Sequence, residues 1–105
     1  MFDRIDPSEA QRRVQAGAAL IDVRELVEFE QARVPGAVLI PLSEFAERYT
    51  ELPQGNEIVL MCAAGMRSAQ AAQFAAQHGY QVTNLEGGIS AWNAAGLPVE
   101  LGDAS

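Results

Sequence analysis

The sequence predicts an α/β fold in which helices cover both faces of a parallel sheet. Short apolar segments of strand length alternate with helix-forming segments along the 105 residues. Parallel strands are joined by crossover helices, and these helices cover the two faces of the sheet. The length suits one domain with one modest core. We expect this domain to span residues 1–101, with a short tail at residues 102–105.

The first half of the chain contains signals for two strands and three helices. Asp6 is placed to cap a helix, Pro7 suits its first turn, and Gly17 is placed to end it. Pro35 and Gly36 form a turn before the second strand. We expect strands at residues 19–23 and 37–40, and helices at residues 7–16, 25–32 and 41–49.

The second half is built around the most apolar strand of the chain. Residues 58–61 are continuously apolar, which is typical of a strand buried on both faces of its sheet. In the helix that follows, three glutamines share one face and apolar residues occupy the other. We expect strands at residues 57–61 and 81–85, and helices at residues 68–78 and 89–95.

The charge of the chain excludes two classes of partner. The net charge is −7, and the seven basic residues are all arginines. Nucleic acids and anionic membranes both require clustered positive charge, so we expect neither as a partner. No apolar run approaches the roughly 20 residues that span a bilayer, and the first residues lack a secretory pattern. We therefore expect a cytoplasmic protein whose acidity serves solubility or, alternatively, a basic partner protein.

The single cysteine, Cys62, is the candidate for chemistry. One cysteine excludes an internal disulfide and a cysteine-rich metal site, and we expect no cofactor or metal. Cys62 comes directly after the most apolar strand, at the edge where open α/β sheets bind ligands. The alternative is a buried, inert cysteine that packs as a small apolar residue.

The loop after Cys62 is suited to stabilising a thiolate. Small residues allow backbone N–H groups to point inward as an anion-binding nest, and Gly65 takes conformations that other residues resist. The next helix adds its positive end, and Arg67 adds a permanent charge. We expect the pKa of Cys62 to lie below the roughly 8.5 of a free thiol. His78 is expected about 15 Å from Ser68 along that helix, so it serves the helix end rather than a Cys–His pair.

Four stretches of the chain match the signatures of a known family. They are LIDVRE at residues 20–25, VPGA at residues 34–37, CAAGMRS at residues 62–68, and LEGG at residues 85–88. Each signature alone is moderately specific, but here the four occur in order and at suitable spacing. The chain therefore resembles the rhodanese domains over nearly all of its length.

The resemblance implies a fold and a reaction. Rhodanese domains have a five-stranded parallel sheet between helices, and they act as sulfurtransferases. Their cysteine takes sulfur from a donor such as thiosulfate, holds it as a persulfide, and passes it to a thiol or cyanide acceptor. A sulfur-relay protein is an alternative partner. Carried onto this chain, Cys62 is the nucleophile, and the substrate-binding cradle consists of Ala63, Ala64, Gly65, Met66 and Arg67.

One position departs from the family pattern, and other signature residues have structural interpretations. Many rhodanese domains have a histidine where this chain has Arg33, a difference that concerns the rim of the site.

Arg24 is spaced to pair with Glu28 one helical turn further on. Trp92 is expected to pack against the sheet, and residues 87–88 are expected to form a tight turn into the last helix.

Three alternative functions are weighed against sulfur transfer. Cysteine phosphatases and arsenate reductases have a longer loop than the four residues between Cys62 and Arg67, and the shorter loop suits a sulfur atom better than a phosphate. A redox role needs an external thiol, because the chain has no second cysteine. The third alternative is a non-catalytic or partner-specific binding module. The sequence leaves open whether Arg67 contacts substrate or holds the loop.

Overall fold

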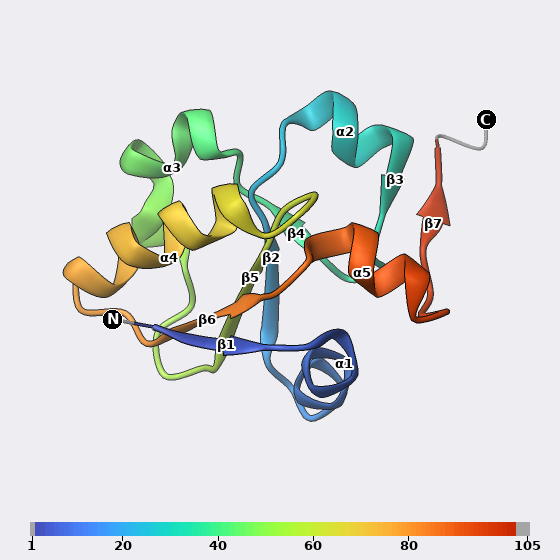
Figure 1. The fold of residues 1–105 in the computed structure, drawn as a ribbon. Helices are drawn as coiled ribbons and strands as arrows, with labels where there is room; N and C mark the ends of the chain where they lie inside the picture. The colour runs from blue at the N-terminus through green and yellow to red at the C-terminus, as the bar shows by residue number, and fades with distance from the viewer. Residues whose placement is uncertain (1, 103–105) are drawn as a thin grey trace.

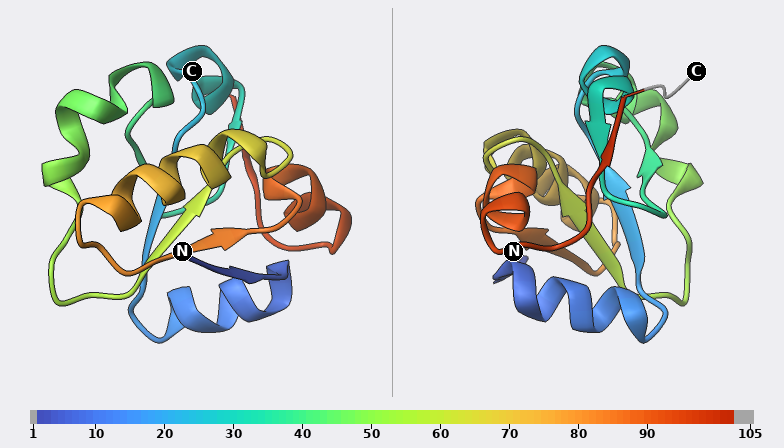
Figure 2. Two further views of the ribbon diagram at one scale, coloured as in Figure 1. Left: turned by 60° about the vertical axis from the view of Figure 1, so that its left-hand side comes forward. Right: turned by 90° about the vertical axis from the view of Figure 1, so that its right-hand side faces the viewer.

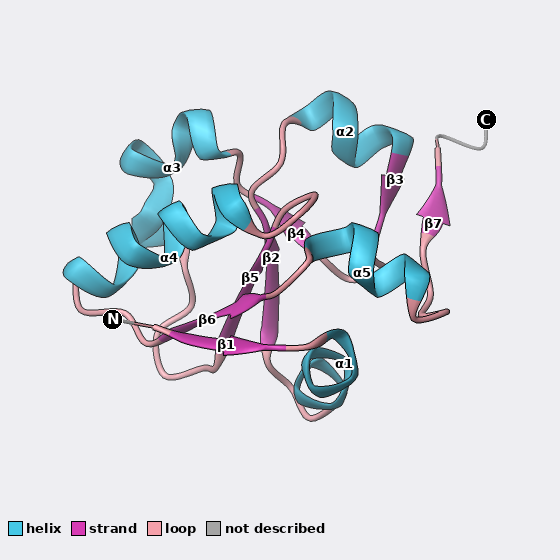
Figure 3. Cartoon of the chain, in the orientation of Figure 1, coloured by secondary structure: helices cyan, strands magenta, loops and turns pink. Residues whose placement is uncertain are grey.

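The computed structural model describes residues 2–102 and confirms the expected five-stranded parallel sheet. The strands lie in the order β1-β6-β5-β2-β4, with β5 at the centre (Figure 1). They are β1 (Asp3–Ile5), β2 (Ala19–Asp22), β4 (Val38–Leu39), β5 (Ile58–Met61) and β6 (Val82–Leu85). A separate antiparallel ribbon joins β3 (Ala32–Arg33) to β7 (Glu100–Leu101) (Figure 3).

Helices cover both faces of the sheet, as the sequence predicts. They are α1 (Pro7–Gln15), α2 (Leu26–Gln31), α3 (Leu42–Arg48), the short 3-10 helix η1 (Tyr49–Glu51), α4 (Met66–Gln77) and α5 (Gly88–Ala94). Helices α3 and α4 pack on one face, and α1 and α5 pack on the other (Figure 2). The expected cap of α1 is present, because the Asp6 carboxylate accepts a hydrogen bond from the Glu9 N–H at 2.9 Å.

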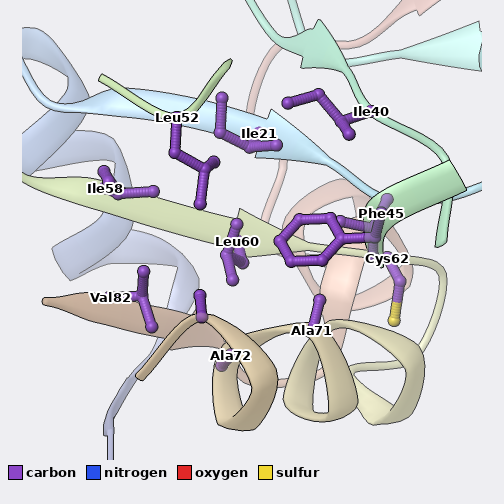
Figure 4. Packing of buried hydrophobic residues seen from close by; sticks show 12 residues of the cluster. Ile21, Ile40, Phe45, Leu52, Ile58, Leu60, Cys62, Ala71, Ala72 and Val82 are labelled. Atoms are coloured by element: carbon purple, nitrogen blue, oxygen red, sulfur yellow. The ribbon is translucent and has the colours of Figure 1, made fainter. Parts of the chain in front are cut away.

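Strand β5 separates two apolar cores. Ile58 and Leu60 face the core beneath α3 and α4, whereas Val59 and Met61 face the core beneath α1 and α5. All four residues of β5 are buried, which explains the absence of polar positions in the strand. Figure 4 shows the first core, with Cys62 at one end of it. The cysteine therefore continues from the most deeply packed strand of the sheet.

The structure contains short strands that the sequence analysis did not predict. β1, β3 and β7 have three residues or fewer, too few for a hydrophobic period to show. Helix α4 also begins two residues earlier than expected, at Met66, because Gly65 ends the loop with a positive φ of 101°. Met66 and Arg67 therefore belong to the first turn of the helix rather than to the loop.

A buried ion pair stands at the carboxyl end of β2. Asp22 is fully buried, and the Arg24 guanidinium donates to its carboxylate at 2.8 Å. Further guanidinium hydrogens reach the backbone carbonyls of Glu28 and Ala32. The predicted ion pair between Arg24 and Glu28 is therefore wrong. The one-turn spacing rule applies within a helix, whereas Arg24 precedes α2 and turns back to Asp22.

The end of the described chain meets the antiparallel ribbon. The Gly102 N–H donates to the Gln31 carbonyl at 2.6 Å, and the Arg33 guanidinium donates to the Gly102 carbonyl at 3.1 Å. The rest of the tail expected at residues 102–105 lies outside the described residues, as does Met1 at the start of the expected domain. Within residues 2–102, no helix has the length and apolar character needed to cross a bilayer.

Replacing Arg24 with leucine is expected to lower the free energy of unfolding by about 3–5 kcal/mol, because Asp22 would stay buried without a counter-ion. Arg48→Leu is the control, since Arg48 pairs with Glu44 and Glu51 at the surface and its loss is expected to cost much less. Urea unfolding followed by circular dichroism measures both variants. Equal losses would contradict a special contribution of the buried pair.

Candidate active site

Cys62 lies immediately after β5, at the carboxyl edge of the sheet. The residue is 1% exposed, and its Sγ accepts hydrogen bonds from the Gly65 N–H at 3.1 Å and the Ser68 hydroxyl at 3.3 Å. The loop turns back on the sulfur because Gly65 adopts its left-handed conformation. A Cβ at Gly65 would also lie 3.0 Å from the Gly87 nitrogen, a tight approach that adds to the conformational preference for glycine.

The hydrogen bonds around Cys62 favour its ionised form. Burial by itself raises the pKa of the thiol. Four donors oppose that effect: the Ser68 hydroxyl, followed by the backbone N–H groups of Ser68, Gly65 and Ala64. The donors outweigh the burial, so the pKa of Cys62 lies below its ordinary value. The amino end of α4 supports the same state, since its partial positive charge lies at the end of this loop.

Helix α5 holds the backbone of the loop from the side opposite the sulfur. The carbonyls of Cys62 and Ala63 accept hydrogen bonds from the N–H groups of Ile89 at 2.9 Å and Ser90 at 3.1 Å. In a trans peptide the C=O and N–H groups point in opposite directions. Turning the Ala63 carbonyl toward α5 therefore turns the Ala64 N–H toward the sulfur.

Gly88 makes this contact between α5 and the loop possible. The expected tight turn at residues 87–88 is present, and both glycines have positive φ angles, of 79° and 58°. A Cβ at Gly88 would lie 2.3 Å from the Cys62 carbonyl oxygen and 2.6 Å from the Ala63 carbonyl carbon. No side chain fits at these distances, so Gly88 is needed for the close approach as well as for the turn.

A buried asparagine on the neighbouring strand holds the far end of the loop. Asn84 of β6 is fully buried, and its Nδ2 donates to the Gly65 carbonyl at 3.1 Å and to the Glu86 carboxylate at 2.7 Å. Glu86 in turn pairs with Arg4 of β1 at 3.2 Å. Side chains of both strands beyond β5 thus fix the position of the Gly65 peptide.

The guanidinium of Arg67 is bound to Glu28 of α2. Its Nη1 and Nη2 donate to the two carboxylate oxygens at 2.7 and 2.9 Å, which joins the first turn of α4 to α2. The bond to Arg67 lowers the pKa of Glu28 to about 2, so the pair stays charged at neutral pH. The side chain of Met66, the preceding residue, is 78% exposed.

Other residues singled out by the sequence lie in structural positions. His78 ends α4, and its Nδ1 lies 2.9 Å from the Phe74 carbonyl, as expected for a residue that serves its own helix. Arg33 pairs with Glu100 across the antiparallel ribbon at 3.4 Å. Trp92 is 3% exposed, which confirms its expected packing role. Within residues 2–102, no three His, Cys, Asp or Glu side chains are grouped to hold a metal.

Sequence reasoning missed three parts of this arrangement. It places Ser68 at the helix start and does not identify its hydroxyl as a hydrogen-bond donor to the sulfur. Asn84 did carry a signal, since a polar residue within a strand of the buried sheet needs a hydrogen-bond partner, but finding Gly65 requires the strand order. The contact of Gly88 with Cys62 joins segments distant in the chain, and no local pattern predicts it.

Comparisons with known proteins agree with this geometry. The chain matches the Rhodanese-like domain family over residues 6–95. It is 35% identical to a protein named sulfurtransferase from Allochromatium vinosum, across 94% of this chain and 95% of that protein. It is 29% identical to thiosulfate sulfurtransferase GlpE from Glaesserella parasuis, across 96% and 95% of the two chains. Other relatives are longer, and the chain spans 46% and 40% of two of them.

A solved structure shows the same fold. The crystal structure of a rhodanese-related protein from Thermoplasma volcanium superimposes with a TM-score of 0.90 at 32% identity, covering 95% of this chain and 99% of that one. The similarity therefore extends over the sheet, the helices on both faces and the cysteine loop at their edge. On the match of both sequence and fold, the chain belongs to the Rhodanese-like domain family.

Proposed function

We propose that this protein is a sulfurtransferase that carries sulfur as a persulfide on Cys62. The observation behind the proposal is the group of donors that converges on the Cys62 sulfur, including the Gly65 N–H at 3.1 Å and the Ser68 hydroxyl at 3.3 Å. Such donors stabilise the thiolate, which is the form that attacks another sulfur atom. Membership of the family and relatives named sulfurtransferase support the proposal.

The proposed reaction has two steps, and neither consumes an oxidant or a reductant. The Cys62 thiolate attacks the outer sulfur of thiosulfate, a new S–S bond forms at Sγ, and sulfite leaves with the electron pair of the broken bond. A nucleophile such as cyanide or a thiolate then attacks the outer sulfur of the persulfide. The bond to Sγ breaks, and its electron pair restores the Cys62 thiolate. With cyanide as the acceptor the product is thiocyanate, and with a thiolate the product is a new persulfide.

Within this proposal, Cys62 is the catalytic residue and residues 63–67 form the cradle. Ala64 and Gly65 donate their N–H groups to the sulfur, while the carbonyl of Ala63 is held by α5. Met66 and Arg67 contribute the first turn of α4, whose backbone N–H groups have no partners within the helix. These donors are suited to the negative charge of a persulfide.

The same geometry gives less support to a phosphatase or an arsenate reductase. Only four residues separate Cys62 from Arg67. Both terminal nitrogens of Arg67 donate to Glu28, which leaves fewer of its five N–H groups to hold a tetrahedral oxyanion. A non-catalytic binding module is also less well supported, since it would not require donors arranged around a thiolate.

The proposal includes a cellular setting. A free thiol at the centre of the site suits a reducing compartment such as the cytoplasm. The expected partners are a small-molecule sulfur donor and a thiol or cyanide acceptor, with a sulfur-relay protein as the alternative acceptor. Family membership supports sulfur transfer in general, and the identity of the donor is part of the proposal.

Incubation of the reduced protein with thiosulfate is expected to add about 32 Da, the mass of one sulfur atom, to the intact chain. Cyanide is expected to remove this mass, and Cys62→Ser is expected to abolish it. Mass spectrometry after removal of small molecules measures the change. Sulfur retained by Cys62→Ser would place the carrier elsewhere and overturn the mechanism.

Ser68→Ala is expected to shift the alkylation of Cys62 to higher pH. The variant lacks a donor to the thiolate, so the pKa of Cys62 rises and the reactive form disappears at a higher pH as the solution is acidified. The rate of reaction with iodoacetamide, measured against pH, reports the midpoint. Ser43→Ala is the control, because its hydroxyl binds Glu25 instead. An unchanged midpoint in Ser68→Ala would contradict the assigned role.

Gly88→Ala is expected to lower sulfur transfer at least about tenfold, because the added Cβ must displace the Cys62 and Ala63 carbonyls. Gly96→Ala is the matched control: Gly96 also has a positive φ, of 77°, but no atom lies within 4 Å of its Cβ position. Thiocyanate formation measures activity. Thermal unfolding measures the loss of stability that both variants share because each places alanine at a positive φ. Equal loss of activity in both variants would show that the contact does not position the loop.

A further inference from the structure

The positive charge at the mouth of the site is neutralised. Arg67 is the one charged residue between Cys62 and Ser68, and both of its terminal nitrogens donate hydrogen bonds to the Glu28 carboxylate. The other six arginines are also paired with acidic side chains. These pairs are Arg4–Glu86, Arg12–Glu9, Arg13–Glu57, Arg24–Asp22, Arg33–Glu100 and Arg48–Glu44. The described residues therefore offer no unpaired arginine to a negatively charged donor.

Glu28 is held in place by contacts of its own. Its Oε1 also accepts a hydrogen bond from the Glu25 N–H at 3.1 Å, in a capping box that opens α2. Glu25 in turn accepts a hydrogen bond from the Ser43 hydroxyl at 2.8 Å. Because Arg67 lowers the pKa of Glu28 to about 2, the carboxylate is charged at neutral pH. The Arg67–Glu28 ion pair, which has no net charge, is thus a fixed part of the site.

We propose that Glu28 is a specificity-determining residue: by neutralising Arg67, it lowers the rate with dianionic donors such as thiosulfate relative to donors of lower charge. The favoured class is singly charged sulfane-sulfur compounds, such as organic thiosulfonates and persulfides. This inference rests on the proposed sulfur transfer. Arg67 directly precedes Ser68, whose hydroxyl donates to the Cys62 sulfur at 3.3 Å, so a donor that approaches the sulfur also approaches this pair.

The expected size of the effect follows from Coulomb attraction. In a water-like dielectric, one unpaired cation placed about 7 Å from the charge of the reagent would favour a monoanion about threefold and a dianion about sevenfold at low ionic strength. Glu28 cancels this attraction. A change that grows with the charge of the reagent is an electrostatic signature, and a purely structural role would not produce it.

The first test compares two alkylating reagents on Glu28→Gln, a variant that removes the charge but keeps the size of the side chain. Iodoacetate and iodoacetamide react with the same thiolate and differ by one negative charge. The ratio of their rates therefore cancels any change in the thiolate fraction. We expect this ratio to rise about threefold in Glu28→Gln at low ionic strength. The control is Glu57→Gln, which removes the same charge before β5, at the opposite end of the strand from Cys62.

Arg67→Gln and the double variant complete the cycle. Arg67→Gln leaves Glu28 without its partner, so the ratio of the iodoacetate to the iodoacetamide rate is expected to fall about threefold below that of the unaltered protein. The double variant is neutral and is expected to restore the original ratio. Circular dichroism checks that each variant is folded, and the opposite signs of the single variants exclude a general loosening of the loop. An unchanged ratio in Glu28→Gln, or an equal rise in Glu57→Gln, would overturn the inference.

Sulfur transfer provides the second readout. At low ionic strength, Glu28→Gln is expected to raise kcat/KM about sevenfold with thiosulfate, a dianion, and about threefold with benzenethiosulfonate, a monoanion. Added salt is expected to reduce both gains. If sulfur is transferred but neither the alkylation ratio nor the donor preference moves, the role of Glu28 is wrong. If no variant transfers sulfur while the alkylation ratio changes as expected, the proposed function is wrong and the charge neutralisation by Glu28 stands.

Discussion

The close approach of α5 to the cysteine loop is the constraint on which the site depends. Two helix N–H groups draw the Cys62 and Ala63 carbonyls away from the sulfur, and this leaves the opposite side of the loop lined with N–H donors. The approach is possible only because Gly88 has no side chain. The Asn84 amide and the Ser68 hydroxyl complete the arrangement by holding the Gly65 carbonyl and the sulfur itself. The loop is therefore ordered before any substrate arrives.

Helix α2 borders the site and is attached in a different way from the other helices. None of its residues is buried, so apolar packing contributes little to its position. Polar contacts hold it instead: Arg24 binds carbonyls of Glu28 and Ala32, Arg67 binds the Glu28 carboxylate, and Ser43 binds Glu25. Because these groups are directional, α2 fixes where charge lies at the mouth of the site while the two apolar cores maintain the sheet.

Local patterns in the sequence predicted most of the fold, because most of its elements have local causes. β5 was evident from four consecutive apolar residues, and the start of α1 from Asp6. β1 has no such cause: its three residues join the sheet only by pairing with β6, near the other end of the chain. The same division applies to the site. The strand-loop-helix order predicted the surroundings of Cys62, whereas the partner of Arg67 lies 39 residues away and required the fold.

The depth of the sulfur has a consequence for covalent assembly. A disulfide requires two sulfur atoms about 2 Å apart, and a cysteine that is 1% exposed does not meet its counterpart in a second copy while the loop keeps this conformation. In this conformation, the burial of Cys62 disfavours its oxidation to a disulfide-linked dimer. In the proposed mechanism, a persulfide would place the reactive atom one S–S bond, about 2 Å, beyond the cysteine sulfur. A large acceptor protein would then discriminate between the persulfide and the thiolate by the accessibility of the sulfur rather than by its intrinsic reactivity.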